Sequence, residues 1–140
     1  GLGDVYKRQM VERKSGCILN ISSMNAYTPL TKIPAYSAAK AAVSNFTQWL
    51  ATYLARSGVR VNAIAPGFFM TEQNHALQFN PDGTPTPRCA HIVDGTPMRR
   101  YGELKELIGA MLFLVDERAA SFVTGIVLPV DGGYSAFSGV

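Results

Sequence analysis

Charge, cysteine and long apolar runs are all scarce in this sequence of 140 residues, and each scarcity excludes a class of protein. Charged residues make up 16% of the chain, with 13 Lys and Arg against 10 Asp and Glu. This density is too low for a disordered chain or a nucleic-acid-binding tail. No apolar run approaches the roughly 18 residues of a membrane-spanning helix. Neither nucleic acid nor a membrane is therefore an expected partner.

Cysteine and histidine are also too few for the sites they usually build. Two cysteines, Cys17 and Cys89, make no disulfide framework, and no signal peptide opens the chain, so reduced thiols in the cytoplasm are expected. His75 and His91 lack the spacing and the carboxylate neighbours of a metal site, so no metal is expected.

The first nine residues are expected to be foreign to the protein. The chain opens without methionine, and residues 4–9 resemble the translation of a transposon end used in sequencing-library preparation. Such segments are excluded from fold reasoning. We expect the native sequence, residues 10–140, to be part of a domain whose upstream piece is missing.

Apolar runs and amphipathic segments alternate along the rest of the chain. The pattern predicts strands at residues 16–22, 59–65 and 124–130 and helices at residues 36–57 and 103–116. Gly58 is expected to end the first helix. Residues 70–100, rich in proline and poor in large aliphatics, are predicted to form a loop that acts as a lid.

Each predicted helix carries an apolar face that we expect to pack on the sheet. The first face consists of Ala39, Val43, Phe46, Leu50 and Tyr53, and the second of Leu104, Leu107, Ile108, Met111, Leu112 and Val115. A further stripe on the first helix consists of Ala42, Phe46, Trp49 and Tyr53. This stripe predicts a contact with a second subunit, or with a missing part of the same chain.

Strands that alternate with helices and are apolar throughout indicate a parallel sheet with right-handed crossovers. Three strands leave an open sheet edge and too little surface to cover both helices. We therefore expect an α/β fold, the C-terminal half of a doubly wound, Rossmann-like domain whose N-terminal half is missing.

Ligands of such sheets bind beyond the carboxyl ends of the strands. Ser22 and Ser23 end the first strand, so a hydroxyl is expected to face that crevice. Tyr36 and Lys40 are four residues apart at the start of the long helix, and so share a face. An ammonium beside a phenol favours the phenolate, which lets a tyrosine exchange a proton with a substrate oxygen that a serine holds.

The same Tyr-x-x-x-Lys spacing recurs at Tyr101 and Lys105, so spacing alone is weak evidence. Ser23 lies 13 residues before Tyr36, whereas the residue 13 before Tyr101 is Arg88. Tyr101 is therefore interpreted as a packing or lid residue.

Five motifs taken together resemble the short-chain dehydrogenase/reductase family, in its order and spacing from residue 12 onwards. They are Asn20–Ser23, Tyr36–Lys40, Val61–Gly67, Val123–Gly125 and Val130–Gly133. The resemblance implies hydride transfer between NAD or NADP and a carbonyl or alcohol. It also implies that the complete protein is a homodimer or homotetramer.

The resemblance further implies roles for individual residues. Tyr36 becomes the general acid/base, Lys40 its partner and a ligand of the nicotinamide ribose, and Ser23 the group that polarises the substrate carbonyl. Pro66–Gly67 brings the backbone close to the nicotinamide, and Thr71 contacts its carboxamide. Asn62 and the Asp131–Gly133 turn are expected to be structural.

Departures from the family pattern also carry information. The glycine-rich phosphate loop, the residue that selects NAD or NADP and the catalytic asparagine belong upstream and are absent. The phosphate loop holds the pyrophosphate with backbone N–H groups, so the chain by itself is expected to be inactive. Arg99 stands where many family members have glycine.

The polar lid favours a small polar acid as substrate. Arg88 is the expected carboxylate anchor, because arginine binds carboxylates bidentately, although a solvated loop charge is the alternative. Gln73 and Asn74 are expected to bind substrate hydroxyls. The lid and the C-terminus resemble sugar-acid members of the family, which favours a substrate such as D-mannonate or D-fructuronate. The alternatives are another polyol, a ketoacyl substrate, or a non-catalytic dinucleotide-binding protein.

Overall fold

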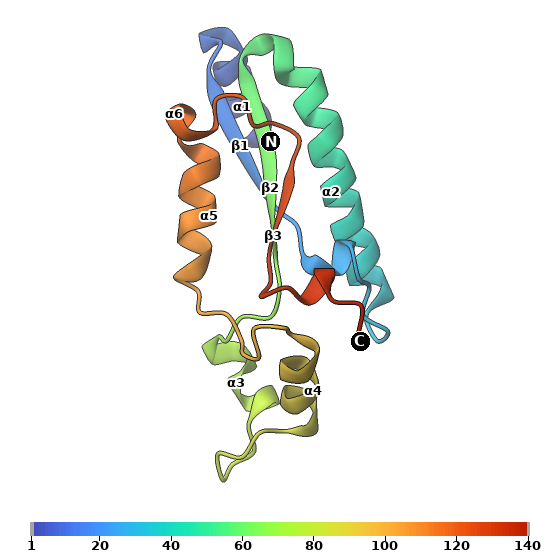
Figure 1. The fold of residues 1–140 in the computed structure, drawn as a ribbon. Coiled ribbons are helices and arrows are strands. Elements are labelled where there is room, and N and C mark those ends of the chain that lie inside the picture. The colour runs from blue at the N-terminus through green and yellow to red at the C-terminus, as the bar shows by residue number, and fades with distance from the viewer. Residues whose placement is uncertain (1, 140) are drawn as a thin grey trace.

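A three-stranded parallel sheet forms the centre of the structure, a computed structural model that describes residues 2–139. The strands are β1 (Gly16–Ile21), β2 (Val59–Pro66) and β3 (Val127–Val130), hydrogen-bonded in the order β1-β2-β3. Because all three run in the same direction, their carboxyl ends meet at one edge of the sheet (Figure 1). The predicted α/β fold with a parallel sheet is confirmed.

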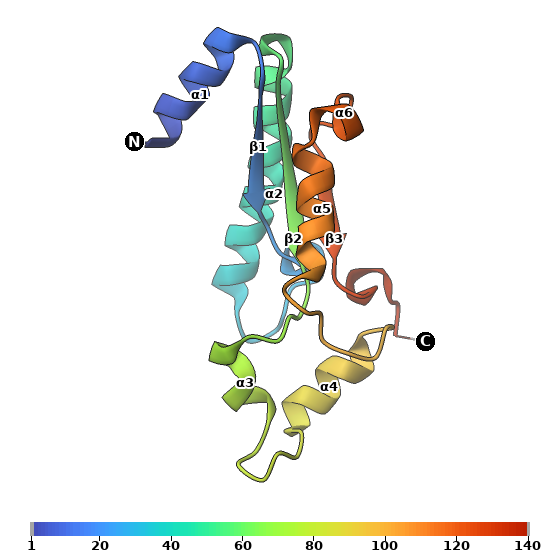
Figure 2. The ribbon, with the colours of Figure 1, turned by 90° about the vertical axis from the view of Figure 1, so that its left-hand side faces the viewer.

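Helices cover both faces of this sheet. They are α1 (Leu2–Arg13), α2 (Pro34–Leu54), α3 (Glu72–Gln78), α4 (Pro87–Gly95), α5 (Glu106–Val115) and α6 (Glu117–Ala120), with one-turn 3-10 helices η1 (Met24–Ala26), η2 (Ala55–Ser57) and η3 (Tyr134–Ala136). α2 lies on one face and α5 on the other, while α3 and α4 lie beyond the carboxyl ends (Figures 1 and 2). No helix among residues 2–139 has the length and apolar composition that a membrane span requires.

Strand β2 is the most buried element, with every residue from Val59 to Ala65 buried. Two of its buried side chains are polar and bind backbone at the sheet's far end. The Arg60 guanidinium donates to the carbonyl oxygens of Leu114 at 2.8 Å and Val123 at 3.3 Å, and so caps the C-terminus of α5. The Asn62 amide donates to the Val123 oxygen at 2.9 Å and accepts from the Ile126 N–H at 3.1 Å. The structural role predicted for Asn62 is confirmed.

The face that α2 turns to the sheet differs from the predicted one. Its buried residues are Ser37, Thr47, Leu50, Ala51 and Leu54. Of the predicted face Leu50 is buried, whereas Ala39, Phe46 and Tyr53 are exposed. Small and hydroxyl-bearing residues let the helix approach closely, and Thr47 Oγ1 accepts a hydrogen bond from Asn20 Nδ2 of β1 at 2.9 Å.

The predicted core face of α5 is also wrong. Leu114 is fully buried, but the large side chains of Leu104, Ile108, Met111, Leu112 and Val115 are exposed. The narrow sheet covers only one stripe of the helix, so a helix that is apolar on nearly every side leaves most of its surface open.

Two predicted segments differ from the observed ones for local reasons. Residues 70–100 contain α3 and α4 rather than a continuous loop, because Thr71 and Thr86 cap short helices there. β3 begins at Val127, since the side chains of Asn62 and Thr124 replace ladder hydrogen bonds before it. The prediction that residues 1–9 are foreign concerns their origin and stays a prediction. Residues 2–9 form most of α1, and residue 1 lies outside the described residues.

Candidate active site

Two serines follow β1 at the sheet's carboxyl edge, and they have different roles. The Ser22 N–H continues the ladder to the Ile64 oxygen at 2.8 Å, and Ser22 Oγ bonds the Lys40 oxygen at 3.1 Å and Ser44 Oγ at 2.6 Å. Ser22 therefore fastens the strand to α2. Ser23 caps η1, its Oγ accepting from the Asn25 N–H at 3.2 Å. An accepting hydroxyl still has its own proton to donate.

Tyr36 and Lys40 come together on the first turns of α2, as their spacing predicts. Pro34 starts this helix, where its fixed φ suits the first turn. Lys40 Nζ lies 5.7 Å from the centroid of the Tyr36 ring and donates to the Ile21 oxygen at 2.8 Å. Ile21 is the last residue of β1 and lies two residues before Ser23. The Tyr36 side chain is 46% exposed, so a ligand can reach its hydroxyl. The strand end, the cation and an accessible phenol thus meet at one place.

Gly67 lies against the turn that follows β3. Its N–H donates to the Val130 oxygen at 3.0 Å, and a Cβ at this position would lie 2.6 Å from the Asp131 Cβ. The Asp131 carboxylate accepts from the N–H groups of Gly133 and Ser135, both at 2.9 Å. The contact with the turn explains the glycine, and the Asp131–Gly133 turn is architectural, as predicted.

Thr71 and Asn74 form a reciprocal cap at the start of α3. Thr71 Oγ1 accepts from the Asn74 N–H at 3.2 Å, while Asn74 Oδ1 accepts from the Thr71 N–H at 3.0 Å. Asn74 Nδ2 donates to the Phe69 oxygen at 2.8 Å. Gln73, between them, is exposed. The structure shows a local role for Thr71 and Asn74, and the predicted cofactor and substrate contacts of all three stay predictions.

Arg88 is exposed in the first turn of α4. The pKa of Tyr101 is raised overall, chiefly by burial and also by Cys89. The positive charge of Arg88 opposes this rise in part. Tyr101 donates to Gln78 Oε1 at 2.6 Å and packs edge-on against Phe68. These contacts agree with the interpretation of Tyr101 as a packing residue.

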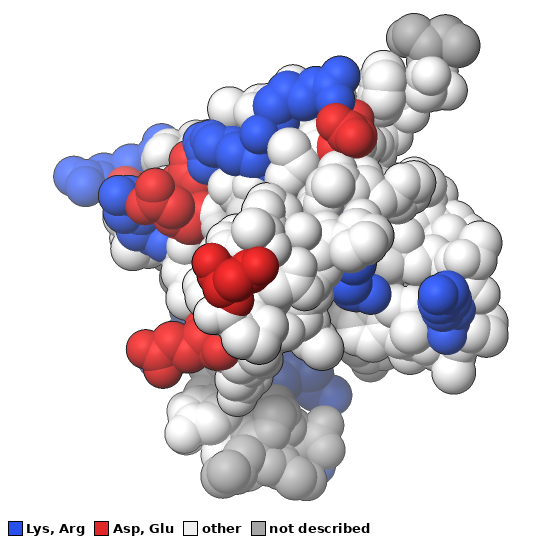
Figure 3. Space-filling view, turned by 90° about the horizontal axis from the view of Figure 1, so that it is seen from below, with Lys and Arg blue, Asp and Glu red and all other residues white. Residues whose placement is uncertain are grey.

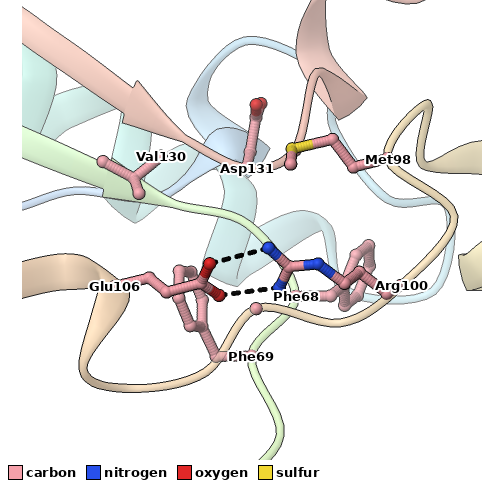
Figure 4. A pocket seen from close by; sticks show the side chains of 9 residues that line it. Phe68, Phe69, Met98, Arg100, Glu106, Val130 and Asp131 are labelled. Atoms are coloured by element: carbon pink, nitrogen blue, oxygen red, sulfur yellow. Dashed lines mark hydrogen bonds and ion pairs between the residues drawn. The ribbon is translucent and has the colours of Figure 1, made fainter.

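An ion pair that the sequence did not reveal joins the end of the lid to α5. Arg100 and Glu106 form two hydrogen bonds, each of 2.7 Å, beside a cavity of about 100 Å³ (Figure 4). The hydrogen bond from Arg100 lowers the pKa of Glu106 to about 2, so the pair persists in mild acid. Its only sequence signal is two opposite charges six residues apart, which is too weak to detect.

The neighbouring Arg99 has a φ of +55°, in the left-handed region that favours glycine. This conformation explains why glycine suits the position. The Arg99 guanidinium bonds both the carbonyl and the carboxylate of Asp94, at 3.0 and 3.1 Å.

Acidic and basic side chains are interspersed on the face seen from the side of α3 and α4 (Figure 3). A surface of mixed sign differs from the single-sign stripe that a nucleic acid selects. Among the side chains that the structure describes, no three His, Cys, Asp or Glu gather in a group that could hold a metal ion.

Comparison with known proteins identifies relatives along nearly the whole chain. The family model described as enoyl-(acyl carrier protein) reductase matches residues 4–135. An uncharacterised oxidoreductase of Haemophilus influenzae is 60% identical over 136 residues, which are 97% of this chain and 48% of the relative.

Solved structures show the same fold. A protein from Haemophilus influenzae, provisionally assigned as a D-mannonate oxidoreductase and crystallised with NAD, is 64% identical with a TM-score of 0.85, over 89% of this chain and 44% of that one. A gluconate 5-dehydrogenase from Burkholderia cenocepacia, in complex with NADP and tartrate, is 36% identical with a TM-score of 0.83, over 94% and 49% of the two chains.

The chain spans about half the length of the curated relatives it matches. Its three parallel strands correspond to the C-terminal part of a Rossmann-like domain, as the sequence predicts. A suitable test protein is a full-length hybrid, in which residues 10–135 replace the matching segment of the Haemophilus influenzae oxidoreductase.

We expect Gly67→Ala to destabilise the hybrid by about 1–3 kcal/mol, the usual range for overpacking, because the added Cβ collides with Asp131. Gly109→Ala is the matched control, since a Cβ there meets no atom within 4 Å on the helical surface. Alanine should stabilise that helix by about 0.5–1 kcal/mol. Urea unfolding measures both, and equal effects of the two substitutions would contradict the close contact at Gly67.

Proposed function

Because the chain belongs to the short-chain dehydrogenase/reductase family, we propose that it carries the proton-transfer site of an NAD- or NADP-dependent oxidoreductase. The observation that supports this most directly is the position of Lys40. Its ammonium lies beside the Tyr36 ring and bonds the oxygen of Ile21, at the end of β1 where ligands of such sheets bind. The substrate oxygen then lies between Tyr36 and Ser23.

The donor set suits a nicotinamide nucleotide. An ammonium has three protons and Ile21 takes one, which leaves two for the ribose hydroxyls. Pro66–Gly67, one strand away, would bring the backbone to the nicotinamide, and Thr71 would contact its carboxamide. The cofactor, when bound, supplies or accepts the hydride.

The chain's own residues move the proton and hold the reacting oxygen. The Tyr36 hydroxyl gives a proton to the oxygen in reduction and takes one in oxidation, and the charge of Lys40 stabilises the resulting phenolate. Ser23 accepts the Asn25 N–H with a lone pair and donates its own proton to the same substrate oxygen.

We also propose that the complete protein works in the cytoplasm and that the 140-residue chain alone is inactive. The free thiols of Cys17 and Cys89 suit a reducing compartment. The family's phosphate-binding loop lies upstream of the matched segment, so the chain alone lacks the contacts that hold the pyrophosphate.

Tyr36→Phe should lower the turnover of the hybrid by about 10²–10⁴-fold, because it removes only the proton donor. Steady-state reduction of carbonyl substrates with NADH and NADPH measures this loss. Tyr101→Phe, the same change in the second Tyr-x-x-x-Lys pair, is the control and should keep near-normal turnover. Near-normal turnover in Tyr36→Phe would exclude the proton-transfer role and favour a non-catalytic dinucleotide-binding protein.

A sugar acid such as D-mannonate or D-fructuronate is the substrate class we propose. The support is the polar lid and the two structural neighbours, which carry the names of a D-mannonate oxidoreductase and a gluconate 5-dehydrogenase. Arg88, exposed on α4, is the proposed carboxylate anchor, with Gln73 and Asn74 as partners of the hydroxyls.

Arg88→Ala should weaken kcat/KM for the sugar acid by about 1.5–3 kcal/mol and leave neutral polyols nearly unaffected, because a charged hydrogen bond is lost. D-mannonate, D-gluconate, neutral polyols and a ketoacyl thioester, each with NAD(H) and NADP(H), form the panel. Arg56→Ala, on exposed η2, is the control. Equal losses on acids and polyols would leave Arg88 as a solvated charge.

We propose that the exposed aromatic stripe of α2 joins two subunits of a homodimer or homotetramer. Phe46, Trp49 and Tyr53 are each more than half exposed, and their rings stack at centroid distances of 5.7 and 5.2 Å. A two-fold axis beside this helix makes the contact self-complementary and buries the rings.

Trp49→Glu should therefore dissociate the hybrid into monomers, which sedimentation velocity measures directly. Leu77→Glu is the matched control, since Leu77 is as exposed but lies on α3, away from the stripe. An unchanged sedimentation coefficient in Trp49→Glu would exclude this interface.

A further inference from the structure

A buried polar group without a partner lies beside Ser23. Asn25, in the middle of η1, is only 5% exposed. Its Oδ1 is the one buried side-chain nitrogen or oxygen, among the residues that the structure describes, with no hydrogen-bond partner. An unpaired buried acceptor of this kind costs about 1–3 kcal/mol.

Two other amides of the sheet, half-buried Asn20 and buried Asn62, are paired. Asn20 donates to Thr47 Oγ1 at 2.9 Å, and Asn62 bonds the backbone on both sides. The missing partner is therefore specific to Asn25 rather than general to the packing, and an unsatisfied group in a folded protein calls for an explanation such as a ligand.

The turn that carries Asn25 is held at both of its ends. The Asn25 N–H donates to Ser23 Oγ at 3.2 Å, and the Ala26 N–H donates to the Ser23 oxygen at 3.0 Å. The Tyr27 hydroxyl donates to the Val127 oxygen of β3 at 2.9 Å. Because the turn is fixed to Ser23 and to the sheet, the Asn25 backbone stays beside the group proposed to hold the reacting oxygen.

We propose that Asn25 determines specificity by accepting, at Oδ1, a hydrogen bond from a hydroxyl of the bound substrate. The inference rests on the proposed function and adds the recognition of a polyhydroxylated carbon chain next to the reacting carbon. A neutral carbonyl oxygen suits a hydroxyl donor and repels a carboxylate, so Asn25 and Arg88 recognise different parts of one sugar acid. The hydroxyl supplies the missing partner only when substrate is bound.

The test is a double-mutant cycle in which a substrate hydroxyl and the Asn25 side-chain oxygen are removed separately and together. The hybrid and its Asn25→Leu and Asn25→Asp variants are assayed on D-mannonate, D-gluconate and their monodeoxy derivatives. One deoxy derivative should lose about 10–100-fold in kcat/KM with the unsubstituted hybrid, because a buried acceptor is left unpaired. Asn25→Leu should abolish that difference, and Asn25→Asp, which keeps the acceptor, should retain it.

The melting temperature of the substrate-free hybrid is the second readout. Asn25→Leu should leave it unchanged or raise it, since leucine replaces an unpaired oxygen with an apolar group of similar size. A lower melting temperature, with equal losses on every substrate, would show that another part of the protein satisfies Oδ1 and would overturn the inference. An altered dissociation constant for NADH or NADPH would assign Oδ1 to the cofactor and overturn it as well.

Failure of this inference is distinguishable from failure of the proposed function. Tyr36-dependent turnover with an unchanged hydroxyl preference in Asn25→Leu overturns the role of Asn25 and leaves the oxidoreductase intact. If the hybrid turns over simple ketones in a Tyr36-dependent way but does not turn over sugar acids, the role of Asn25 is likewise overturned and the oxidoreductase function is retained. A hybrid without any Tyr36-dependent turnover overturns both.

Discussion

The parallel hydrogen bonding of β2 to a strand on each side is the constraint on which the other features depend. It brings three strand ends to one edge, where Ser23, Gly67 and Asp131 follow β1, β2 and β3 in turn. Parallel pairing also requires long crossovers, and the first of these contains α2. The first turns of that helix return Tyr36 and Lys40 to the edge that the strands have just left, and Lys40 bonds the last residue of β1.

Contacts near the start of β2 stabilise the arrangement of the strand ends at the carboxyl edge. Arg60 and Asn62 are polar residues in a strand that is otherwise apolar. Arg60 binds the end of α5 at Leu114, and both residues bind the Val123 oxygen in the connection from α5 to β3. That connection sets the start of β3 and hence the position of the Asp131 turn, which in turn requires glycine at position 67. Contacts far from the crevice thus fix the backbone that lines it.

Local sequence signals predict the strands, because each is a short apolar run, and they predict the meeting of Tyr36 and Lys40, because four residues separate them on one helix. Gly58 ends the helical segment before β2 with a φ of +70°, as predicted. The buried faces of α2 and α5 were predicted wrongly, since hydrophobicity alone does not show which stripe meets a sheet. On α2, Thr47 and Ala51 are buried because they are small, while the aromatic residues Phe46 and Tyr53 stay outside. The Arg100–Glu106 pair and the unpaired Asn25 depend on tertiary contacts and carry no local pattern.

Hydrogen bonds at the carboxyl edge divide its polar groups into two sets. Ser22 is bound to α2, Thr71 and Asn74 bind one another, and Asp131 holds its own turn. Bonding capacity remains at the Ser23 proton, two protons of Lys40, the half-exposed Tyr36 and the oxygen of Asn25. The Thr71 hydroxyl, which accepts from the Asn74 N–H, likewise keeps its own proton. The first four groups lie between the end of β1 and the first turns of α2. A polar group kept unpaired at a cost in stability favours a ligand that pairs it, which agrees with the proposal that the reacting carbon binds on this side of the crevice.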